Sequence, residues 1–392
     1  MNVLLCPFGE PGYLYPALAV GIELRGRGHT VTVLARPGAA RVVREAGLTP
    51  LDATAYAEAG TFSVSMWTRT GRQQYQAVVR AAGETGAGAL LTSPLCHGAL
   101  LAAEALDLPA TVLGFAAHMW PYREGGEGEP EHVVARRWRL RELLRHYGAT
   151  REQTGMPPRR DRQEDRPLIG AGLLLRGDPA LEYPGAVLPD GVRHVGPCVW
   201  EPRADPAELD RVAGLLARAG KPVVYVHLGR TFGGDSMWPR LNATFTGGPY
   251  QAVVELARSA DARPHPCADI VTVRVPWMDP LVASARMVLT NGTSSPVLAA
   301  LRHGRPLAVA PAGSEQPVLS EACVRSGVAV RFPADEAADG TAALTSALTG
   351  ESPHRVRDLA TRLAATRGAA AAAGFVLSTL SPALAGTSGA AP

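Results

Sequence analysis

The sequence VLTNGTSSPVLAALRHGRPLAVAPAGSEQPVLSEACVRSGVAVRF, residues 288–332, alternates short apolar runs with longer helix-like segments. It predicts three strands and two helices, over 286–290, 296–303, 306–310, 315–326 and 328–332. Strands that alternate with helices form parallel sheets, and ligands bind at the loops beyond the carboxyl ends of such strands. The stretch therefore predicts an α/β domain with a binding site at these loops.

The first of these loops, TNGTSSP, consists of Gly and small hydroxyl residues. We expect Ser295 to be the N-cap of the following helix and Pro296 its first residue. The N–H groups and the dipole at a helix start favour an anion such as a phosphate. Because Pro296 has no N–H, the donors would be amides and hydroxyls of Thr293, Ser294 and Ser295 and the amide of Val297. Alternatively, the Ser-Ser-Pro sequence only caps the helix.

The N-terminal part of the chain repeats the same alternation. A strand at 2–8, a helix from about Pro16 and a strand at 30–35 form a βαβ unit. Strands near 89–92 and 109–115 continue it. These elements predict a first parallel α/β domain.

The two domains are expected to follow each other in the chain, because 392 residues exceed one ordinary core. Between them, the Pro- and Gly-rich segment 183–206 is typical of a linker. Further strands are expected at 222–228 and 270–275. Helices are expected at 131–146, within a charged and mobile insert at about 121–167, and at 206–219 and 353–367, and an Ala-rich helix is expected to end near 380. The predicted organisation is a domain at 1–200, a domain at 201–375 and a C-terminal tail or helix at 376–392, with ligands in the interdomain cleft.

The composition is that of a soluble globular protein, with 46% hydrophobic and 19% charged residues and a net charge of +3. This balance gives no sign of nucleic-acid binding or of a polybasic membrane anchor. The most apolar stretch, 89–120, contains His and acidic residues, so no membrane span is expected. Five widely spaced cysteines argue against a disulfide framework or a zinc site, and no signal peptide is recognisable. We expect a cytoplasmic protein, and its Arg- and Ala-rich composition suggests an actinobacterium.

The segment from Thr290 to Pro306 resembles, without a gap, the donor-binding signature of the GT-B glycosyltransferases of the UDP-glucuronosyl/UDP-glucosyltransferase superfamily. This superfamily includes bacterial enzymes that decorate antibiotics. Its pattern is T-H-G-G-x-G-T, a helix, G-x-P, an apolar strand and D-Q, and here it is TNGTSSP, HGRP, LAVAP and EQ. The resemblance extends to GHTVTVLA, LAAEALDLPA, VGP and KPVVYVHLGRTFG elsewhere in the chain.

The resemblance implies two Rossmann-like parallel-sheet domains, with the C-terminal helix packing back toward the N-terminal domain. It also implies metal-independent, inverting transfer of a sugar from a dTDP- or UDP-linked donor to a small natural-product acceptor, without a further cofactor. The C-terminal domain would bind the donor and the N-terminal domain the acceptor. By the match to the signature, the diphosphate would be held by Asn291, Gly292, Thr293, Ser294 and Ser295.

Other positions of the C-terminal domain match donor-binding positions of the superfamily. Gly229 and Arg230 match its Gly-Ser/Thr pair, and an Arg there could meet the diphosphate bidentately or simply be a surface residue. Trp277 matches the Trp that stacks on the base. Glu315 and Gln316 match the Asp-Gln pair that hydrogen-bonds sugar hydroxyls, although a Glu at a helix start is also good capping.

The catalytic base of the superfamily is missing. That base is a His in the pattern H-x-x-P, and counting back from Pro16 leads to Tyr13. The Asp that orients the His is also missing, since the corresponding strand ends in Leu91, Thr92 and Ser93. A phenol with a pKa of about 10 is a poor base at pH 7, whereas a His near 6.5 is well placed. Packing or substrate contact is therefore the favoured role of Tyr13.

Three explanations remain open. Another residue could be the base, and Glu10, His97 and His118 are the candidates, although a lone His is more often structural. The acceptor could need little deprotonation, as a thiol, an amine or an acidic phenol does. The protein could also be an auxiliary or binding subunit without transfer activity. In each case we expect the acceptor beside Gly12, Tyr13 and His118.

Rival enzyme classes fit less well. Arg36 would suit the 2′-phosphate of NADP, but the loop GEPGYLYP lacks the G-x-G-x-x-G fingerprint. A metal-dependent GT-A transferase is disfavoured because the chain has no Asp-x-Asp pair. A GT-B sugar-nucleotide epimerase and a homodimeric state both stay open.

Overall fold

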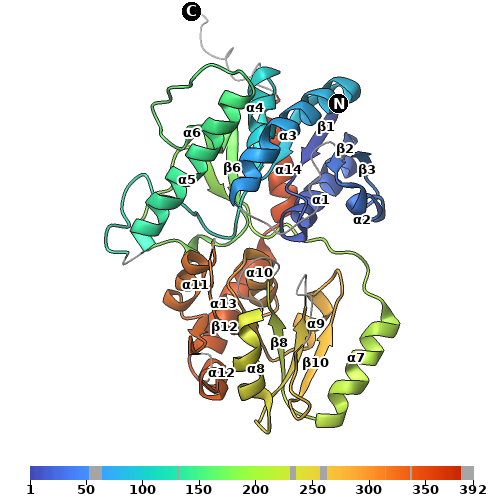
Figure 1. Cartoon of the computed structure of the whole chain (residues 1–392), viewed down its shortest axis with the longest axis vertical. Helices are drawn as coiled ribbons and strands as arrows, with labels where there is room; N and C mark the ends of the chain where they lie inside the picture. The colour runs from blue at the N-terminus through green and yellow to red at the C-terminus, as the bar shows by residue number, and fades with distance from the viewer. Residues whose placement is uncertain are drawn as a thin grey trace, which may run out of the picture. The chain divides into compact units, whose positions relative to one another are not determined.

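The computed structural model describes residues 1–52, 64–129, 132–229, 235–256, 263–313, 315–335 and 338–380. The chain divides into two compact units (Figure 1). Unit 1 comprises Met1–Arg176, Gly185–Trp200 and the chain from Arg367 onward. Unit 2 comprises Gly177–Pro184 and Glu201–Thr366.

Unit 1 contains a seven-stranded parallel sheet in the order β3-β2-β1-β4-β5-β6-β7. Its strands are β1 (Asn2–Cys6), β2 (Thr30–Ala35), β3 (Thr49–Asp52), β4 (Ala87–Thr92), β5 (Ala110–Leu113), β6 (Gly172–Leu175) and β7 (Val192–His194). The helices are α1 (Pro11–Gly26), α2 (Ala40–Glu45), α3 (Val64–Thr85), α4 (His97–Ala105), α5 (His132–Gln153), α6 (Arg166–Ile169) and α14 (Gly368–Ser378). The strand order reverses between β1 and β4, which places the loops after these two strands at the usual ligand-binding point of such a sheet.

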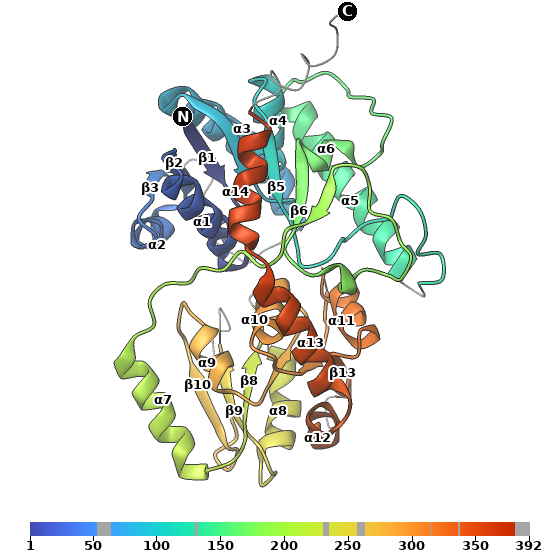
Figure 2. The same cartoon turned by 180° about the vertical axis from the view of Figure 1, so that it is seen from behind.

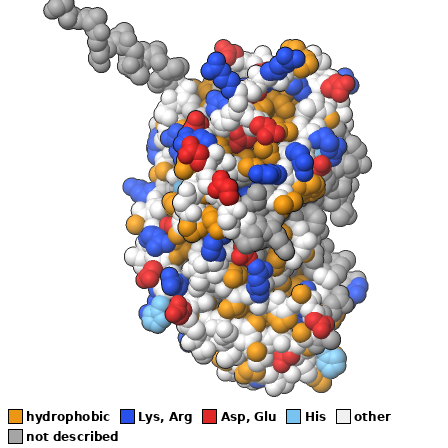
Figure 3. All heavy atoms as spheres, turned by 90° about the vertical axis from the view of Figure 1, so that its left-hand side faces the viewer, with side chains coloured by type: hydrophobic (Ala, Val, Ile, Leu, Met, Phe, Trp, Pro, Cys, Tyr) orange, Lys and Arg blue, Asp and Glu red, His pale blue; other side chains and the backbone are white. Residues whose placement is uncertain are grey.

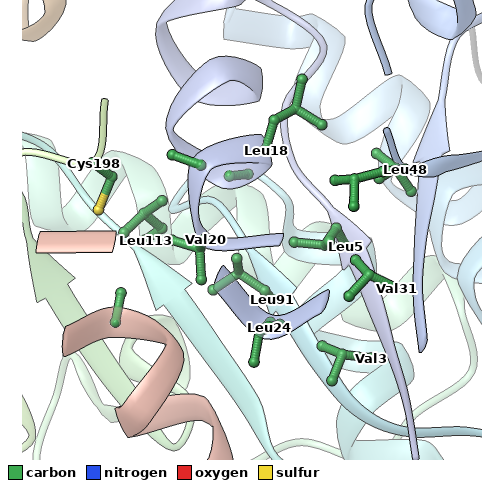
Figure 4. Packing of buried hydrophobic residues seen from close by; sticks show 14 of the residues in the cluster. Val3, Leu5, Leu18, Val20, Leu24, Val31, Leu48, Leu91, Leu113 and Cys198 are labelled. Carbon is green, nitrogen blue, oxygen red and sulfur yellow. The ribbon is translucent and has the colours of Figure 1, made fainter. Parts of the chain in front are cut away.

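The core of unit 1 lies between its sheet and the helices α1 and α14. Leu5 of β1, Leu18 of α1, Val31 of β2 and Leu91 of β4 interdigitate there (Figure 4). Figure 2 shows α14 beside α1, and its buried Ala372, Ala373 and Val376 belong to the same cluster. The predicted packing of the C-terminal helix on the N-terminal domain is therefore confirmed.

Helix α1 begins earlier than expected. The prediction started it at Pro16, but it begins at Pro11, which as the first helical residue needs no N–H acceptor. The amides of Tyr13 and Leu14 both donate to the Glu10 carbonyl, at 2.9 and 2.8 Å. Tyr13 thus lies in the first turn of a helix and not in a loop.

Two segments carry more regular structure than predicted. The helix of the charged insert extends to Gln153, beyond the predicted 146. The segment 183–206 is not only a linker, because its residues 192–194 form β7 and pair with β6. This edge strand was not predicted because it has only three residues, too few to show an apolar pattern.

Unit 2 contains a six-stranded parallel sheet in the order β10-β9-β8-β11-β12-β13. Its strands are β8 (Val223–His227), β9 (Gln251–Glu255), β10 (Ile270–Val273), β11 (Met287–Thr290), β12 (Leu307–Val309) and β13 (Ala329–Arg331). Its helices are α7 (Pro206–Ala219), α8 (Trp238–Phe245), α9 (Asp279–Ser284), α10 (Ser294–Arg302), α11 (Gln316–Arg325), α12 (Thr341–Thr349) and α13 (Ser352–Ala365). The order reverses between β8 and β11, so their loops occupy the corresponding ligand-binding point.

The start of α10 differs from the prediction. Thr293, not Ser295, is the N-cap, and Pro296 is the third helical residue. A Pro is tolerated there because the first-turn N–H groups have no acceptor within the helix. The amide of Val297, which was expected to face the ligand, donates to the Thr293 carbonyl at 3.3 Å.

The described surface and helices give two further observations. On the face drawn in Figure 3, acidic and basic side chains are interspersed with hydrophobic ones. Within the described ranges, every helix is too short or too polar to cross a membrane.

Candidate active site

In unit 2, the glycines after β8 and β11 bring two loops and a helix together. A Cβ on Gly229 would lie 2.1 Å from the Asn291 Nδ2 atom, and a Cβ on Gly292 would lie 2.2 Å from the Ser320 Oγ atom of α11. Both glycines have positive φ, +79° and +85°. Only a residue without a side chain fits such a conformation and such close approach. The loops after β8 and β11 and the helix after β12 therefore form one compact cradle.

The same hydrogen-bonding device holds both glycine turns. His227, the last residue of β8, accepts the Gly229 N–H on its Nδ1 atom at 3.2 Å. Thr290, the last residue of β11, accepts the Gly292 N–H on its Oγ1 atom at 3.2 Å. In each case a strand-end side chain binds the amide two residues on, as in an Asx or ST turn.

The loop that matches the superfamily's donor-binding signature continues from Asn291 into α10. The Asn291 Oδ1 atom accepts from the Thr293 amide at 3.3 Å and from its hydroxyl at 3.1 Å. The N–H groups of Ser294 and Ser295 occupy the first two helical positions, where the helix itself offers no acceptor. The five consecutive residues matched to this signature span the loop and the first two positions of α10. Arg230 lies outside the described residues.

The residues matched to the sugar-binding pair lie at the start of α11. The Gln316 Oε1 atom accepts from the amides of Ala312 and Gly313, at 2.8 and 3.1 Å. That oxygen shapes the loop, so the amide nitrogen is the end with which Gln316 would meet a sugar hydroxyl. Glu315 is the N-cap of α11 but makes no side-chain capping bond. A carboxylate at this position is still favoured by the helix dipole without such a bond.

Trp277 is buried before α9, with 4% of its surface exposed. Glu201 accepts the amides of Met278 and Asp279 on its Oε2 atom, at 2.8 and 3.0 Å, and burial raises its pKa. His303 donates to the Asp279 carboxylate at 2.9 Å. Burial alone would raise the pKa of Asp279, but this bond and the nearby cations lower it. These contacts fix the turn that follows Trp277.

In unit 1, Tyr13 is held between two aromatic rings. Its ring meets those of Phe8 and Phe115 edge to face, with centroids 5.6 and 5.9 Å away. Ser93, at the place of the missing Asp, accepts the Phe8 amide on its Oγ atom at 3.1 Å. The position of the missing dyad is therefore occupied by packing and by a backbone hydrogen bond.

Glu10 pairs with Arg36. The Arg36 Nη2 atom lies 3.4 Å from the Glu10 Oε1 atom and donates to the Gly9 carbonyl at 3.1 Å. This pairing ties the loop before α1 to the end of β2. Gly12 follows in the first turn of α1, beside Tyr13.

His97 is the first residue of α4 and is almost fully buried. Its ring meets that of Tyr147 on α5, with centroids 6.0 Å apart. Burial, helped by the charge of His146, lowers the pKa of His97 to about 3. An imidazole so weakly basic is disfavoured as a general base at neutral pH.

His118 follows β5 and is also buried. Its Nε2 atom lies 3.2 Å from the Pro121 carbonyl oxygen, and its ring lies 5.0 Å from that of Trp120. Arg136 of α5 donates to the His118 carbonyl. The guanidinium also pairs with Glu129 at 2.8 Å. A buried charge pair thus holds the segment that carries His118.

Sequence reasoning did not select several of these residues. His227 and Glu255 are the last residues of the adjacent strands β8 and β9. In the sequence each is a single polar residue after an apolar run, which does not indicate a role. Arg136 gave no signal because it lies in an Arg-rich helix. Within the described residues, no group of three or more His, Cys, Asp or Glu side chains is arranged to hold a metal ion.

The chain is similar to named glycosyltransferases in sequence. It is 26% identical to glycosyltransferase GtfC of Amycolatopsis orientalis over 97% of the chain and 98% of that protein. It is 30% identical to 4'-demethylrebeccamycin synthase of Lentzea aerocolonigenes over 206 residues, which are 49% of the chain and 46% of that protein. No protein-family model matches the sequence.

Its fold is similar to that of solved glycosyltransferases. The crystal structure of the kitacinnamycin glycosyltransferase superposes with a TM-score of 0.73 at 21% identity, covering 96% of this chain and 98% of that one. The calicheamicin glycosyltransferase CalG4 superposes with a TM-score of 0.70 at 21% identity, covering 97% and 98%.

The chain therefore has the GT-B fold, and the predicted fold class is confirmed. The predicted resemblance to bacterial natural-product glycosyltransferases is confirmed as well, and the named relatives support a glycosyltransferase enzyme.

Proposed function

We propose that this protein is an inverting glycosyltransferase that moves a sugar from a dTDP- or UDP-linked donor to a small natural-product acceptor. The observation that carries the proposal is the cradle of Gly229, Asn291 and Gly292 at the start of α10. A diphosphate suits it because backbone amides and a helix start favour an anion. A solved neighbour, the spinosyn rhamnosyltransferase SpnG, was crystallised with thymidine diphosphate, which supports dTDP as the nucleotide.

The cradle would act mainly on the leaving group. As the bond between sugar and diphosphate breaks, negative charge grows on the phosphate oxygens, and donors already in place stabilise it without reorganisation. Those donors would be the backbone amides of Ser294 and Ser295 and the side-chain Nδ2 atom of Asn291. No metal ion or further cofactor is part of the proposal. Addition of EDTA should therefore leave the transfer rate unchanged.

The acceptor side favours a nucleophile that needs little help from a protein base. His97 is too weakly basic, and Glu10 is paired with Arg36. Tyr13 packs between aromatic rings, and His118 is fully buried. We infer that the acceptor is an acidic phenol or a thiol, which ionises readily, or an amine, which attacks through its neutral nitrogen and loses its proton to solvent afterwards. Gly12 and Tyr13 would line its place in unit 1, whereas His118, with 0% of its surface exposed, would not contact the acceptor without a rearrangement. The reaction would proceed in the cytoplasm.

Incubation with dTDP- and UDP-sugars and a set of phenolic, thiol, amine and aliphatic-alcohol acceptors tests this proposal. Mass spectrometry should detect glycosylated phenol, thiol or amine and little glycosylated aliphatic alcohol. The anomeric coupling in the product should show inversion. Equal transfer to aliphatic alcohols would contradict the acceptor assignment. Nucleotide-sugar binding without any transfer or hydrolysis would instead indicate an auxiliary subunit.

A further inference from the structure

His227 and Glu255 form a buried pair beneath the donor cradle of unit 2. They are register partners at the carboxyl ends of β8 and β9. Both are largely buried, and the His227 Nε2 atom lies 3.4 Å from the Glu255 Oε2 atom. A carboxylate at this distance attracts an N–H on that ring nitrogen.

The contacts on both sides of the imidazole define its tautomer. Nδ1 accepts the Gly229 N–H, so the proton of the neutral ring is on Nε2, the nitrogen that faces Glu255. The other tautomer would place two N–H groups against each other at Gly229. Glu255 therefore selects the ring state in which His227 can hold the Gly229 amide.

The held amide belongs to the residue that lies against Asn291. Gly229 has φ +79°, and its α-carbon approaches the Asn291 side chain so closely that a Cβ would collide with Nδ2. Asn291 in turn accepts from Thr293, the N-cap of α10. A chain of direct contacts thus runs from Glu255 through His227 and Gly229 to the diphosphate loop.

We propose that His227, oriented by Glu255, is a positioning residue for the donor site: its Nδ1 atom fixes the Gly229 turn against Asn291. The inference rests on the proposed function, because it assigns the cradle to a nucleoside diphosphate. His227 itself touches no substrate in this account. It acts only through the Gly229 turn.

The neighbouring strand supplies an internal comparison. Thr290 holds the Gly292 amide in the same way as His227 holds that of Gly229. Asn291 shows that an Asn oxygen in this loop accepts the amide two residues on. His227→Asn should therefore keep the acceptor that His227→Phe removes.

The test combines dTDP binding with a measurement that needs no ligand. His227→Phe should weaken dTDP binding roughly tenfold, the order expected for one lost buried hydrogen bond, and His227→Asn should restore most of it. Glu255→Gln should remain near wild type because its amide oxygen can still attract the proton on Nε2, whereas Glu255→Leu should behave like His227→Phe. With a transferable acceptor, the donor KM should rise while the acceptor KM stays constant.

Amide hydrogen exchange at Gly229, followed by NMR, gives the ligand-free readout. Exchange should accelerate in His227→Phe and stay slow in His227→Asn. Unchanged exchange and unchanged dTDP affinity in His227→Phe would overturn the inference, as would equal losses in the Phe and Asn variants. If wild-type protein binds no nucleoside diphosphate while the exchange result holds, the proposed function fails and the turn assignment stands.

Discussion

Replacing Gly229 by Ala tests the cradle most sharply, because the structure gives both parts of the cost. The new side chain would adopt φ +79°, which costs about 1–2 kcal/mol for a residue other than Gly. Its Cβ would lie 2.1 Å from Asn291 Nδ2, so the Asn291 side chain must move. That movement breaks two hydrogen bonds to Thr293, each worth about 0.5–1.5 kcal/mol. We expect a total loss in the free energy of unfolding of about 2–5 kcal/mol.

Gly220→Ala is the matched control in the same unit. Gly220 ends α7 with φ +63°, and a Cβ there would meet no atom within 4 Å. Its replacement should cost only the conformational part, about 1–2 kcal/mol. Urea unfolding measures both variants, and calorimetry measures their affinity for dTDP and UDP. Only Gly229→Ala should lose nucleotide affinity. Equal destabilisation of the two variants, or unchanged affinity in Gly229→Ala, would refute the reasoning.

Three further predictions concern unit 1. Arg136→Met leaves Glu129 buried without its guanidinium and should cost about 3–5 kcal/mol in urea unfolding, so a cost below about 1 kcal/mol would contradict a buried pair. His97 has its pKa lowered to about 3, so the unfolded chain takes up its proton first, and stability should fall by about 1.4 kcal/mol per pH unit below about 6.5 as the pH drops toward 3. Relative to His97→Met, wild type should show this extra acid sensitivity, and parallel pH profiles would count against it. Tyr13→Phe should keep transfer activity within about twofold because the ring contacts remain, whereas a large loss would make the phenol a participant in the chemistry.

The sequence was sufficient to predict the two parallel sheets and the loops that face the ligand. Apolar runs such as VVYVH and MVLT are bounded by Gly-containing turns, and their order reproduces that of the superfamily. Strands β3, β6 and β9 (Gln251–Glu255) and the edge strand β7 were missed, because each is only three to five residues long and gives too short a pattern. Local pattern defines strong elements better than edges.

The sequence predicted the site residues whose type is dictated by the local backbone, such as glycines in tight turns. It did not predict side chains that contact each other across neighbouring strands. Gly229 and Gly292 matched glycine positions of the signature, and both adopt positive φ. His227 and Glu255 are 28 positions apart by their numbering, and only the register of β8 and β9 brings them together. The N-cap of α10 was misplaced because Ser295 before a Pro has the usual capping pattern, whereas Thr293 takes that place.

Calorimetric titration of the purified protein with dTDP, UDP and GDP tests the central claim most directly. The account predicts saturable 1:1 binding of dTDP or UDP and its loss in Gly229→Ala but not in Gly220→Ala. Failure of all three nucleotides to bind the folded protein would contradict the donor site in unit 2.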